Sequence, residues 1–572
     1  MRALRAPFHP SLGSMQSRRS ENIALHAVRG ILTVDLFPSR AHFPRGKSRV
    51  GWAKLQRNMP ELPVIARAMS HRRSVAIRSE SGESTYDNLL NRSRSVASAL
   101  LAGVDDLHET RVAVLLPAGP GYVAAQWGVW RAGGIHLPFS LAATEPEWEY
   151  ALADSGAAII LSTTATASRI GSLCQRLSRR LLMIEDIAPT TDRALPDIGP
   201  ERRAMMLYTS GTTSKPKGVV TTHANLQAQI ESLVEAWEWQ ATDRIPLFLP
   251  LHHIHGVINV LGCALWSGAT VETFETFDAA AILDRVRAGA YTLFMAVPTI
   301  YVKLIDWFQA ASEAERLATP TAFRRLRLMV SGSAALPASL HDDWFQWTGQ
   351  RLLERYGMTE IGMALSNPYH GERRPGSVGL ALPGVEVRLK AETGELVTGE
   401  GVPAEIQVRG PGVFREYWNR PEITADAFDD GWFRTGDMAV VESGYYRIMG
   451  RLSVDIIKSG GYKLSALEIE STLLEHPDIR ECAVVGVRDE TWGEAVAVAV
   501  VLNDGARLDL DGLRDWCRDH LSVYKIPKRL LVVGSLPRNA MGKVTKPAVR
   551  DLFATLGEAL HVDLDGMSGV AT

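Results

Sequence analysis

The stretch Tyr208-Thr-Ser-Gly-Thr-Thr-Ser-Lys-Pro-Lys-Gly218 combines hydroxyl groups, glycines and two lysines directly after the apolar run Ala204 to Leu207. Glycines let backbone amides approach phosphate oxygens, hydroxyls add donors or a magnesium ligand, and Lys215 and Lys217 balance negative charge. The spacing differs from the P-loop pattern Gly-x-x-x-x-Gly-Lys-Ser/Thr. The composition therefore predicts a polyphosphate loop, although a solvated turn has a similar composition.

Further motifs follow this stretch along the chain. They are Leu249-Pro-Leu-His-His-Ile-His-Gly256, Tyr356-Gly-Met-Thr-Glu360, Gly431-Trp-Phe-Arg-Thr-Gly-Asp437, Gly450-Arg451 and Pro537-Arg-Asn-Ala-Met-Gly-Lys543. Together with the first stretch they resemble the signature motifs of the adenylate-forming superfamily, which includes acyl-CoA synthetases, luciferases and peptide-synthetase adenylation domains. The resemblance covers roughly residues 60 to 550. Their common order favours this family over a chance match.

The alternation of short β-branched runs with helical segments predicts an α/β fold with largely parallel, layered sheets. We expect strands at 111–116, 157–161, 326–330, 482–487 and 495–501, and helices at 121–131, 464–476 and 510–520. The resemblance implies a large N-terminal domain of layered αβ sheets and a small mobile C-terminal α+β domain. The predicted division is 1–58, 59–450 and 451–572, with the small domain last.

Bulk composition agrees with a multidomain enzyme. The 572 residues, 46% of them hydrophobic and 22% charged, are enough for more than one core. A net charge of −2 gives no reason to expect nucleic acid as a partner, and no apolar run approaches the ~18 residues that span a bilayer. The four cysteines lack metal-ligand spacing, which suits a reducing compartment.

The N-terminal segment 1–58 differs from the rest. It contains nine Arg and two Lys against Glu21 and Asp35, a net charge of +9. Such a basic, Ser-containing composition fits an organelle transit peptide, which would place a eukaryotic protein in the mitochondrial matrix. The alternative is a non-native extension from a misassigned start codon, with a cytoplasmic protein starting at Met15, Met59 or Met69.

The resemblance implies a reaction in which a carboxylate attacks the α-phosphate of ATP and pyrophosphate departs. The implied nucleotide-binding residues are Thr209, Ser210, Gly211, Thr212, Thr213 and Lys217 at the phosphates, Ser333, Ala334, Ala335, Tyr356, Gly357, Met358 and Thr359 around adenine, and Asp437 and Arg451 at the ribose. Asp437 can accept both ribose hydroxyls, with Arg451 as a second contact.

Catalytic roles follow from the same resemblance. Glu360, with Thr209 nearby, is predicted to hold Mg²⁺, a hard cation that prefers oxygen ligands. Lys543 is predicted to reach the α-phosphate and the substrate carboxylate. His253, in the loop over the acyl pocket, is the third predicted catalytic residue.

Coenzyme A is the implied second substrate, and in the family the small domain rotates before the thiol attacks. Lys458, Ser459, Gly460 and Gly461 would line the pantetheine tunnel, since glycines permit close backbone approach. The segment Arg451 to Lys458 carries Ser453 where many members have Asp or Lys, and it is one residue longer than the common pattern. The hinge residue is therefore either Ser453 or Asp455.

Arg355 indicates which acid is activated. The residue directly before Tyr-Gly-x-Thr-Glu faces the acyl pocket in the family and is usually small. A guanidinium beside an apolar chain would be unfavourable by several kcal/mol unless it met an anion. A second substrate carboxylate supplies that anion through a bidentate pair. Arg374, His255 and Ser331 are predicted to complete an acid-binding pocket.

We therefore predict a malonyl-CoA synthetase with ATP, Mg²⁺ and coenzyme A, acting on malonate or methylmalonate. Closer resemblance to that enzyme type, including its mitochondrial form, lies in segments 295–301, 330–337 and 353–363. A pairing of Arg355 with Glu354 would remove the acid-reading role. The alternatives are a ligase for a monocarboxylic acid, a domain that loads a carrier protein and a non-catalytic nucleotide-binding regulator. The oligomeric state is left open.

Overall fold

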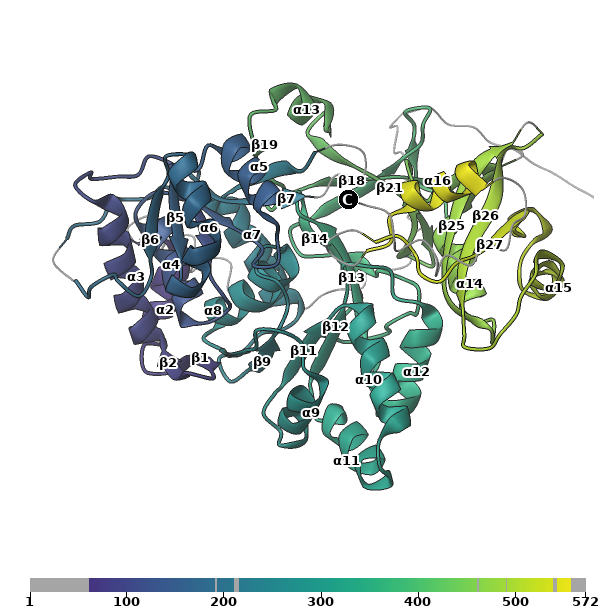
Figure 1. The fold of residues 1–572 in the computed structure, drawn as a ribbon, viewed down its shortest axis with the longest axis horizontal. Helices are drawn as coiled ribbons and strands as arrows, with labels where there is room; N and C mark the ends of the chain where they lie inside the picture. Colours follow the sequence, from purple (N-terminus) through teal and green to yellow (C-terminus); the bar gives the residue numbers. More distant parts are fainter. Residues whose placement is uncertain are drawn as a thin grey trace, which may run out of the picture. The chain divides into compact units, whose positions relative to one another are not determined.

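The computed structural model describes residues 61–190, 193–209, 215–459, 462–489, 491–538 and 543–556. The predicted segment 1–58 lies outside these ranges, as do Ser210, Gly211, Thr212, Thr213, Gly460 and Gly461. Strands of the described part form five sheets (Figure 1). The predicted fold class is confirmed: a large N-terminal α/β domain precedes a smaller C-terminal domain.

The first sheet carries the phosphate motif on a hairpin. Its strand order is β19-β8-β7-β4-β3-β5-β6, with β3 to β6 parallel to one another where they pair. The strands are β3 (Arg111–Leu115), β4 (Ile135–Pro138), β5 (Ile159–Ser162), β6 (Arg180–Met183), β7 (Arg203–Thr209), β8 (Lys217–Thr222) and β19 (Glu416–Tyr417). The predicted strand 111–116 and strand 157–161 are confirmed within two residues.

Helices accompany this sheet. They are α2 (Pro63–Met69), α3 (Tyr86–Leu101), α4 (Pro120–Arg131), α5 (Glu145–Ser155), α6 (Thr164–Arg176) and α7 (His223–Ala236). The helix predicted at 121–131 is α4, which begins with Pro120 as its first residue, where the missing N–H leaves no bond unmade. It is buried along most of its length, which explains its weak amphipathic pattern.

Two further sheets complete the middle of the chain. One has the order β2-β1-β10-β9, and the other β11-β12-β13-β14-β15. Their strands are β1 (Val75–Ser79), β2 (Gly82–Thr85), β9 (Arg244–Leu247), β10 (Thr270–Thr273), β11 (Leu293–Ala296), β12 (Leu328–Ser331), β13 (Leu353–Met358), β14 (Gly362–Ser366) and β15 (Leu380–Ala381). Strands β12 and β13 run parallel and bring Ser331 opposite Glu354.

The helices of this region pack in two apolar clusters: the first two along the chain join the cluster that also includes α3 and α4, and the other four, which lie beside β11 and β12 (Figure 1), share a second cluster with these strands. They are η2 (His255–Gly262), α8 (Cys263–Ser267), α9 (Ala279–Arg287), α10 (Pro298–Ala310), α11 (Glu313–Arg324) and α12 (Ala338–Thr348). The strand predicted at 326–330 is β12, which starts and ends slightly later. Its carboxyl end therefore delivers Ser331 and the following loop to one edge of the sheet.

An antiparallel sheet carries the ribose motif. It has the order β17-β16-β18-β21-β20, and β22 pairs with β21. The elements are β16 (Glu386–Lys390), β17 (Leu396–Val397), β18 (Ala404–Arg409), β20 (Phe428–Asp429), β21 (Trp432–Glu442), β22 (Tyr445–Arg451) and the helix α13 (Pro421–Asp426). Asp437 of β21 is paired in register with Arg451 of β22, so the two predicted ribose contacts lie side by side on neighbouring strands.

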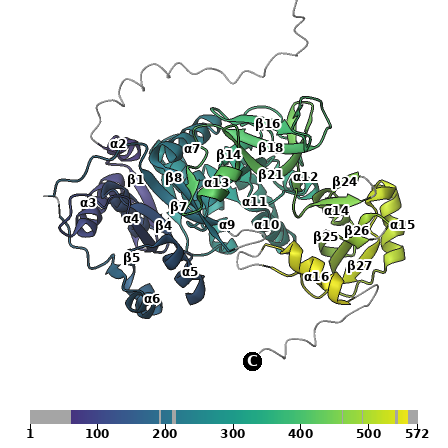
Figure 2. The ribbon, with the colours of Figure 1, turned by 90° about the horizontal axis from the view of Figure 1, so that it is seen from above.

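The last sheet, ordered β24-β23-β26-β25 with β27 beside β26, is covered by α14, α15 and α16 (Figure 2). The elements are β23 (Ile456–Ser459), β24 (Tyr462–Ser465), β25 (Ile479–Asp489), β26 (Gly493–Leu502), β27 (Arg529–Val532), α14 (Ala466–Leu473), α15 (Leu510–His520), η3 (Val523–Lys525) and α16 (Lys546–Leu556). Alternate residues of β26 contribute to two different apolar clusters, as a strand buried on both faces requires.

The helix predicted at 464–476 is shorter in the structure. Residues Tyr462–Ser465 pair with β23 instead, and α14 begins after Ser465, whose hydroxyl accepts from the Glu468 amide at 3.1 Å. The helix at 510–520 and the strands at 482–487 and 495–501 are confirmed, the strands extending further. In the described ranges, no helix is long and apolar enough to cross a membrane.

Candidate active site

The base of the phosphate loop is a β-hairpin. Thr209 ends β7 and pairs with Lys217, the first residue of β8, and the Thr209 hydroxyl lies 3.5 Å from the Lys217 carbonyl oxygen. The four predicted phosphate contacts between them lie outside the described residues. The hairpin therefore places one hydroxyl and one ammonium group at the ends of the predicted loop.

Glu360 lies in the turn between β13 and β14 and is 5% exposed. Its Oε1 accepts from the Tyr417 hydroxyl at 2.9 Å, and the Lys217 ammonium lies 4.5 Å from the centre of the Tyr417 ring. Burial raises the pKa of Glu360, against the opposing effect of this hydrogen bond. Tyr417 thus joins two predicted site residues that are far apart in the sequence.

Glu360 and Thr209 could hold Mg²⁺ only together with ligands from water and the substrate. Within the described ranges no group of three or more His, Cys, Asp or Glu side chains could hold a metal ion. Glu360 and Thr209 offer one carboxylate and one hydroxyl. Mg²⁺ usually takes one or two carboxylates and completes its shell with water and substrate phosphates, so this oxygen donor set fits it.

The ribose acid is held by two neighbours. Asp437, 8% exposed, accepts from the Tyr356 hydroxyl at 2.7 Å through Oδ2 and from Arg451 Nε at 3.1 Å through Oδ1. Each carboxylate oxygen has a further lone pair for a ribose hydroxyl. The predicted adenine, ribose and hinge-side residues therefore meet at one carboxylate.

The predicted adenine residues lie on two neighbouring segments. Ser333, Ala334 and Ala335 are exposed in the loop after β12, and Gly357, Met358 and Thr359 follow Tyr356 at the end of β13. A Cβ at Gly357 would lie 2.1 Å from the Gly362 carbonyl oxygen, so this tight turn requires glycine. This turn between β13 and β14 also places Glu360 next to the adenine segment.

Arg355 is the most unusual residue of the site. Its side chain is 4% exposed, its Nε is buried without a hydrogen-bond partner, and its NH2 atom lies 3.5 Å from the Ser333 hydroxyl. No ion pair with Arg355 occurs among the described residues, including its neighbour Glu354. Burial lowers the pKa of Arg355 to about 10, which still leaves the guanidinium charged at neutral pH.

The loop after β12 is built around this guanidinium. A Cβ at Gly332 would lie 2.4 Å from Arg355 Cζ, so only glycine lets the loop approach so closely. On the neighbouring position of β13, Glu354 accepts from the Leu336 amide at 3.0 Å. Burial raises the pKa of Glu354 to about 8. Arg355 and Glu354, adjacent residues of β13, therefore contact the two ends of the loop from Gly332 to Leu336.

His255 meets Arg355 through the Ser333 hydroxyl, and Ser331 directly precedes Gly332, whose backbone approaches the guanidinium; the acid pocket itself stays a prediction. His255 Nδ1 is 3.2 Å from the same Ser333 hydroxyl, and both His255 Nε2 and the Ser331 hydroxyl are buried without a partner. Burial and the charge of Arg355 lower the pKa of His255 well below its usual value, so its ring is neutral. Burial, with His252 and Lys543, lowers the pKa of His253 to about 3.

Arg374 does not belong to this group. Its guanidinium forms an ion pair with Glu372 at 2.9 Å and lies 3.9 Å from the centre of the Tyr445 ring. A partner only two residues away satisfies its charge near the surface. These contacts give no support to a place for Arg374 in the acid pocket, and that role stays a prediction.

Lys543 lies near the other cations of the site. Its side chain keeps access to solvent, while partial burial and the charges of Arg451 and Arg355 lower its pKa. Lys543, although it comes from the end of the chain, therefore lies within electrostatic range of one predicted ribose residue and one predicted acid-binding residue.

The predicted coenzyme A segment begins on β23. Ser459 is 4% exposed and pairs with Gly493 of β26, whereas Lys458 is exposed and its amide donates to Glu494 at 2.7 Å. Of the two hinge candidates, Asp455 accepts from the Arg451 amide at 3.0 Å. Both candidates lie in the short turn between β22 and β23.

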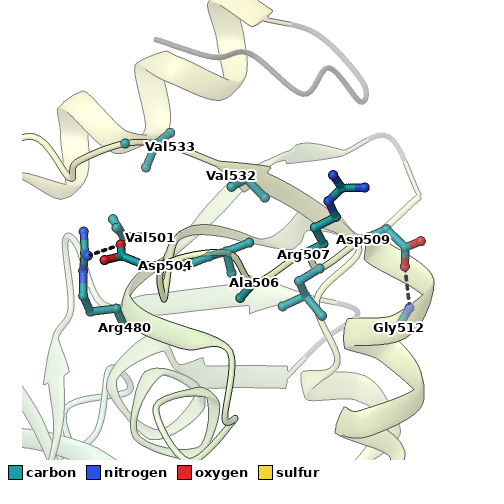
Figure 3. Close-up of a pocket in the computed structure, with 12 residues that line it drawn as sticks. Arg480, Val501, Asp504, Ala506, Arg507, Asp509, Gly512, Val532 and Val533 are labelled. Atoms are coloured by element: carbon teal, nitrogen blue, oxygen red, sulfur yellow. Dashed lines mark hydrogen bonds and ion pairs between the residues drawn. The ribbon is translucent and has the colours of Figure 1, made fainter. Parts of the chain in front are cut away.

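A hollow of about 850 Å³ lies elsewhere, on the small domain (Figure 3). It is lined by residues of β25, β26, β27 and α15, and Arg480 pairs there with the exposed Asp504 at 3.7 Å. No predicted site residue is among those that line it. Size alone therefore does not identify the active site of this protein.

Sequence reasoning missed Tyr417 and Glu354. Tyr417 is separated from Glu360 by 57 residues, and only the pairing of β19 with β8 brings it beside Lys217. Glu354 was weighed only as a partner for Arg355. The sequence did offer a signal for Glu354: it is a charged residue directly after the apolar pair Leu352-Leu353, and charged residues are rarely buried without a role.

Comparison with known proteins agrees with this geometry. Residues 65–418 match the AMP-binding enzyme family, and residues 468–543 match the AMP-binding enzyme C-terminal domain. A mitochondrial malonate–CoA ligase, ACSF3 of Mus musculus, is 44% identical, covering 85% of this chain and 89% of its own length. A malonate–CoA ligase of Arabidopsis thaliana is 40% identical, covering 78% and 79%.

A solved structure is also similar. The crystal structure of ATP-bound MatB from Rhodopseudomonas palustris has a TM-score of 0.79 and 33% identity, covering 86% of this chain and 99% of that one. The similarity therefore extends over both the large and the small domain.

Proposed function

Because the chain belongs to the AMP-binding enzyme family, we propose that it is an ATP-dependent malonate–CoA ligase. The observation that carries the choice of acid is Arg355, a buried guanidinium with no ion pair in the described part of the chain. A buried cation without a counterion is unfavourable, and a second carboxylate on the substrate would supply one.

The neighbours of Arg355 support an anion rather than an apolar chain. His255 Nε2 and the Ser331 hydroxyl are buried polar groups without partners, and the Ser333 hydroxyl lies between His255 and Arg355. Buried polar atoms are normally hydrogen-bonded, so Arg355 Nε and His255 Nε2, which lack partners among the described residues on either side of the Ser333 hydroxyl, favour a polar ligand. A fatty or aryl chain would leave both of them unpaired.

In the first step, one malonate oxygen attacks the α-phosphate of ATP, a P–O bond to pyrophosphate breaks, and malonyl-adenylate forms. Lys543 would neutralise charge on the α-phosphate, and Asp437 would hold the ribose hydroxyls. Glu360 and Thr209 would hold Mg²⁺, which supplies charge neutralisation at the phosphates. Arg355 would keep the far carboxylate away from the reacting atoms.

In the second step, the thiol of coenzyme A loses its proton and attacks the acyl carbon, and AMP leaves. Lys458, Ser459, Gly460 and Gly461 are the proposed contacts for the pantetheine arm. A rotation of the small domain about Ser453 or Asp455 would remove Lys543 between the steps.

The cellular location follows the same reasoning. The mouse relative is named as a mitochondrial enzyme, and segment 1–58 has the composition of a transit peptide. We propose a mitochondrial matrix enzyme if the source is eukaryotic. Import of the full chain, but not of a chain starting at Met59, would support this.

One experiment tests the acid. Pyrophosphate release is measured with ATP, coenzyme A and a panel of malonate, methylmalonate, succinate, acetate and a long-chain acid. We expect malonate or methylmalonate to give the highest kcat/KM. A preference for acetate or the long-chain acid would favour the monocarboxylic alternative, and no release with any acid would favour a regulatory protein.

A further inference from the structure

A second buried cation lies outside the site described above. Lys546, the first residue of α16, is 8% exposed, and its Nζ lies 2.7 Å from Asp455 Oδ1 and 2.8 Å from Glu470 Oε1. Burial alone would lower the pKa of Lys546, but the charges of Glu470 and Asp455 outweigh it and raise the pKa. The ammonium group therefore stays charged and paired.

On one side of this cluster, Lys546 closely follows the lysine loop, which we define as the segment between Pro537 and Thr545 that carries Lys543 and of which residues 539–542 lie outside the described ranges. Its base is closed by a bridge between Arg538 and Val544 and by a hydrogen bond of 2.9 Å from the Thr545 amide to the Pro537 carbonyl oxygen. Lys543 lies within this loop, only three residues before Lys546. Any shift of Lys546 therefore moves the base from which Lys543 extends.

The other side reaches the nucleotide pocket. Asp455 Oδ2 accepts from the Arg451 amide at 3.0 Å, and Arg451 Nε donates to Asp437 Oδ1 at 3.1 Å. Gly450 has a φ of +119°, and a Cβ there would lie 2.4 Å from Asp455 Cβ. Asp455 thus fits closely under the strand that carries Arg451.

Glu470 fixes the third point. Its Oε1 also accepts from the Val484 amide at 2.7 Å, which ties α14 to β25. The cluster consequently joins the hinge segment, the sheet of the small domain and the lysine loop through one ammonium group. A lysine that merely filled a gap would not need two carboxylates at salt-bridge distance.

We infer that Lys546 is a positioning residue for adenylate formation: by binding Asp455 and Glu470 it sets the base of the lysine loop, so that Lys543 reaches a nucleotide held at Arg451 and Asp437. This inference rests on the proposed function, because it needs Lys543 to serve the first step. Lys546 itself does not touch the substrate.

The test separates the two half-reactions. Adenylate formation is followed by malonate-dependent exchange of pyrophosphate into ATP, and the second step by thioester formation from supplied malonyl-adenylate and coenzyme A. For Lys546→Met we expect the exchange kcat to fall about 10- to 100-fold, because small displacements of a catalytic group have effects of this size. The KM values and thioester formation should change less than about twofold.

Two further variants guard against a folding defect. Lys546→Met leaves two partly buried carboxylates without their partner, so Lys546→Met/Glu470→Gln is made to restore the original net charge of the cluster. Lys546→Arg should recover most of the exchange activity. Arg480→Met is the matched control, since Arg480 forms an exposed pair in the same domain (Figure 3) and exposed pairs contribute little.

The double variant Lys543→Ala/Lys546→Met decides the mechanism. If Lys546 acts through Lys543, adding Lys546→Met to Lys543→Ala lowers exchange no further. An equal loss in both backgrounds, an unchanged exchange rate in the charge-matched variant, or a parallel loss of both half-reactions in it would overturn the inference. Wild-type exchange and Lys543→Ala alone test the proposed function, so its failure is recognised separately.

Discussion

Arg355 and Lys546 are both buried cations, but their surroundings are opposite. Arg355 is 4% exposed and has no ion pair in the described ranges, and burial lowers its pKa to about 10. Lys546 is 8% exposed and holds two carboxylates within 2.8 Å. A buried charge without an ion pair in the protein is available to a ligand. A buried charge that two protein carboxylates bind instead holds the surrounding segments in place.

Replacing each cation by methionine tests this comparison most strongly. For Arg355→Met we expect kcat/KM for malonate to fall about 30- to 5,000-fold, because removing one partner of a buried charge pair is unfavourable by about 2 to 5 kcal/mol. Pyrophosphate release with malonate measures the loss. Activity within twofold of wild type would show that Arg355 does not contact the acid.

The same pair of variants should differ in stability. Lys546→Met leaves two partly buried carboxylates without their partner and should lower the free energy of unfolding by at most about 3 to 5 kcal/mol, the loss for a fully buried pair. Arg355→Met removes an unpaired buried charge, so its free energy of unfolding should stay the same or rise. Denaturant unfolding of the ligand-free proteins measures both values, and an equal destabilisation would contradict the comparison.

Lys543 is a third cation near the site, and it retains access to solvent. For Lys543→Ala we expect malonate-dependent exchange of pyrophosphate into ATP to fall about 100- to 1,000-fold, as for loss of a group that stabilises developing charge. Thioester formation from malonyl-adenylate should be preserved, because the lysine serves only the first step. Equal losses in both steps would argue against this role.

Asp437 is a buried anion of the site, and, like Lys546, it has protein partners: a donor from the protein binds each of its two carboxylate oxygens. For Asp437→Ala we expect ATP affinity to fall about 10- to 150-fold, because a hydrogen bond to a charged acceptor contributes about 1.5 to 3 kcal/mol. Equilibrium binding of ATP measures the change. Asp437→Asn, which keeps one acceptor oxygen, should lose less, and an unchanged affinity in the alanine variant would refute the contact.

Glu354, the neighbour of Arg355, makes a prediction about how the free energy of unfolding depends on pH. Burial raises its pKa to about 8, above the unfolded value near ~4.3, so the folded protein holds this proton more tightly. Its stabilising contribution is complete below the unfolded pKa and is lost as pH rises towards 8. Between pH 6 and 8, wild type should therefore lose more unfolding free energy than Glu354→Gln, by at most about 1.4 kcal/mol per pH unit.

Denaturant titrations at both pH values measure this difference. Histidines titrate in the same range but are common to both proteins, so they cancel. Identical slopes would show that Glu354 is ionised in the folded state at pH 6.

Particular residues show how far sequence reasoning reached. Tyr356, Asp437, Arg451, Ser333, His255 and Arg355 were all predicted, and the structure brings them together. These residues belong to short motifs, in which chemistry and spacing lie close in the chain. Arg374 pairs with its near neighbour Glu372, a partner that is visible in the sequence, and its role in the acid pocket stays a prediction.

Secondary structure followed the same rule. The helix at 510–520 was predicted to the residue, since its apolar spacing and the capping Asp509 are local. The helix at 464–476 was overestimated, because Tyr462–Ser465 has helical spacing but gains ladder hydrogen bonds by pairing with β23. Long-range pairing overrides local preference where a strand partner is available.

The amino-acid sequence by itself determined the chemistry of this protein: an adenylating loop, a ribose acid, a terminal lysine and an arginine where an acyl pocket is expected. Only the tertiary structure decided which charges have partners. It left Arg355 without an ion pair among the described residues, surrounded Lys546 with Asp455 and Glu470, and placed Tyr417 between Glu360 and Lys217. The reason is physical: a motif specifies a functional group, but the energy of a buried charge depends on atoms that lie far apart along the chain.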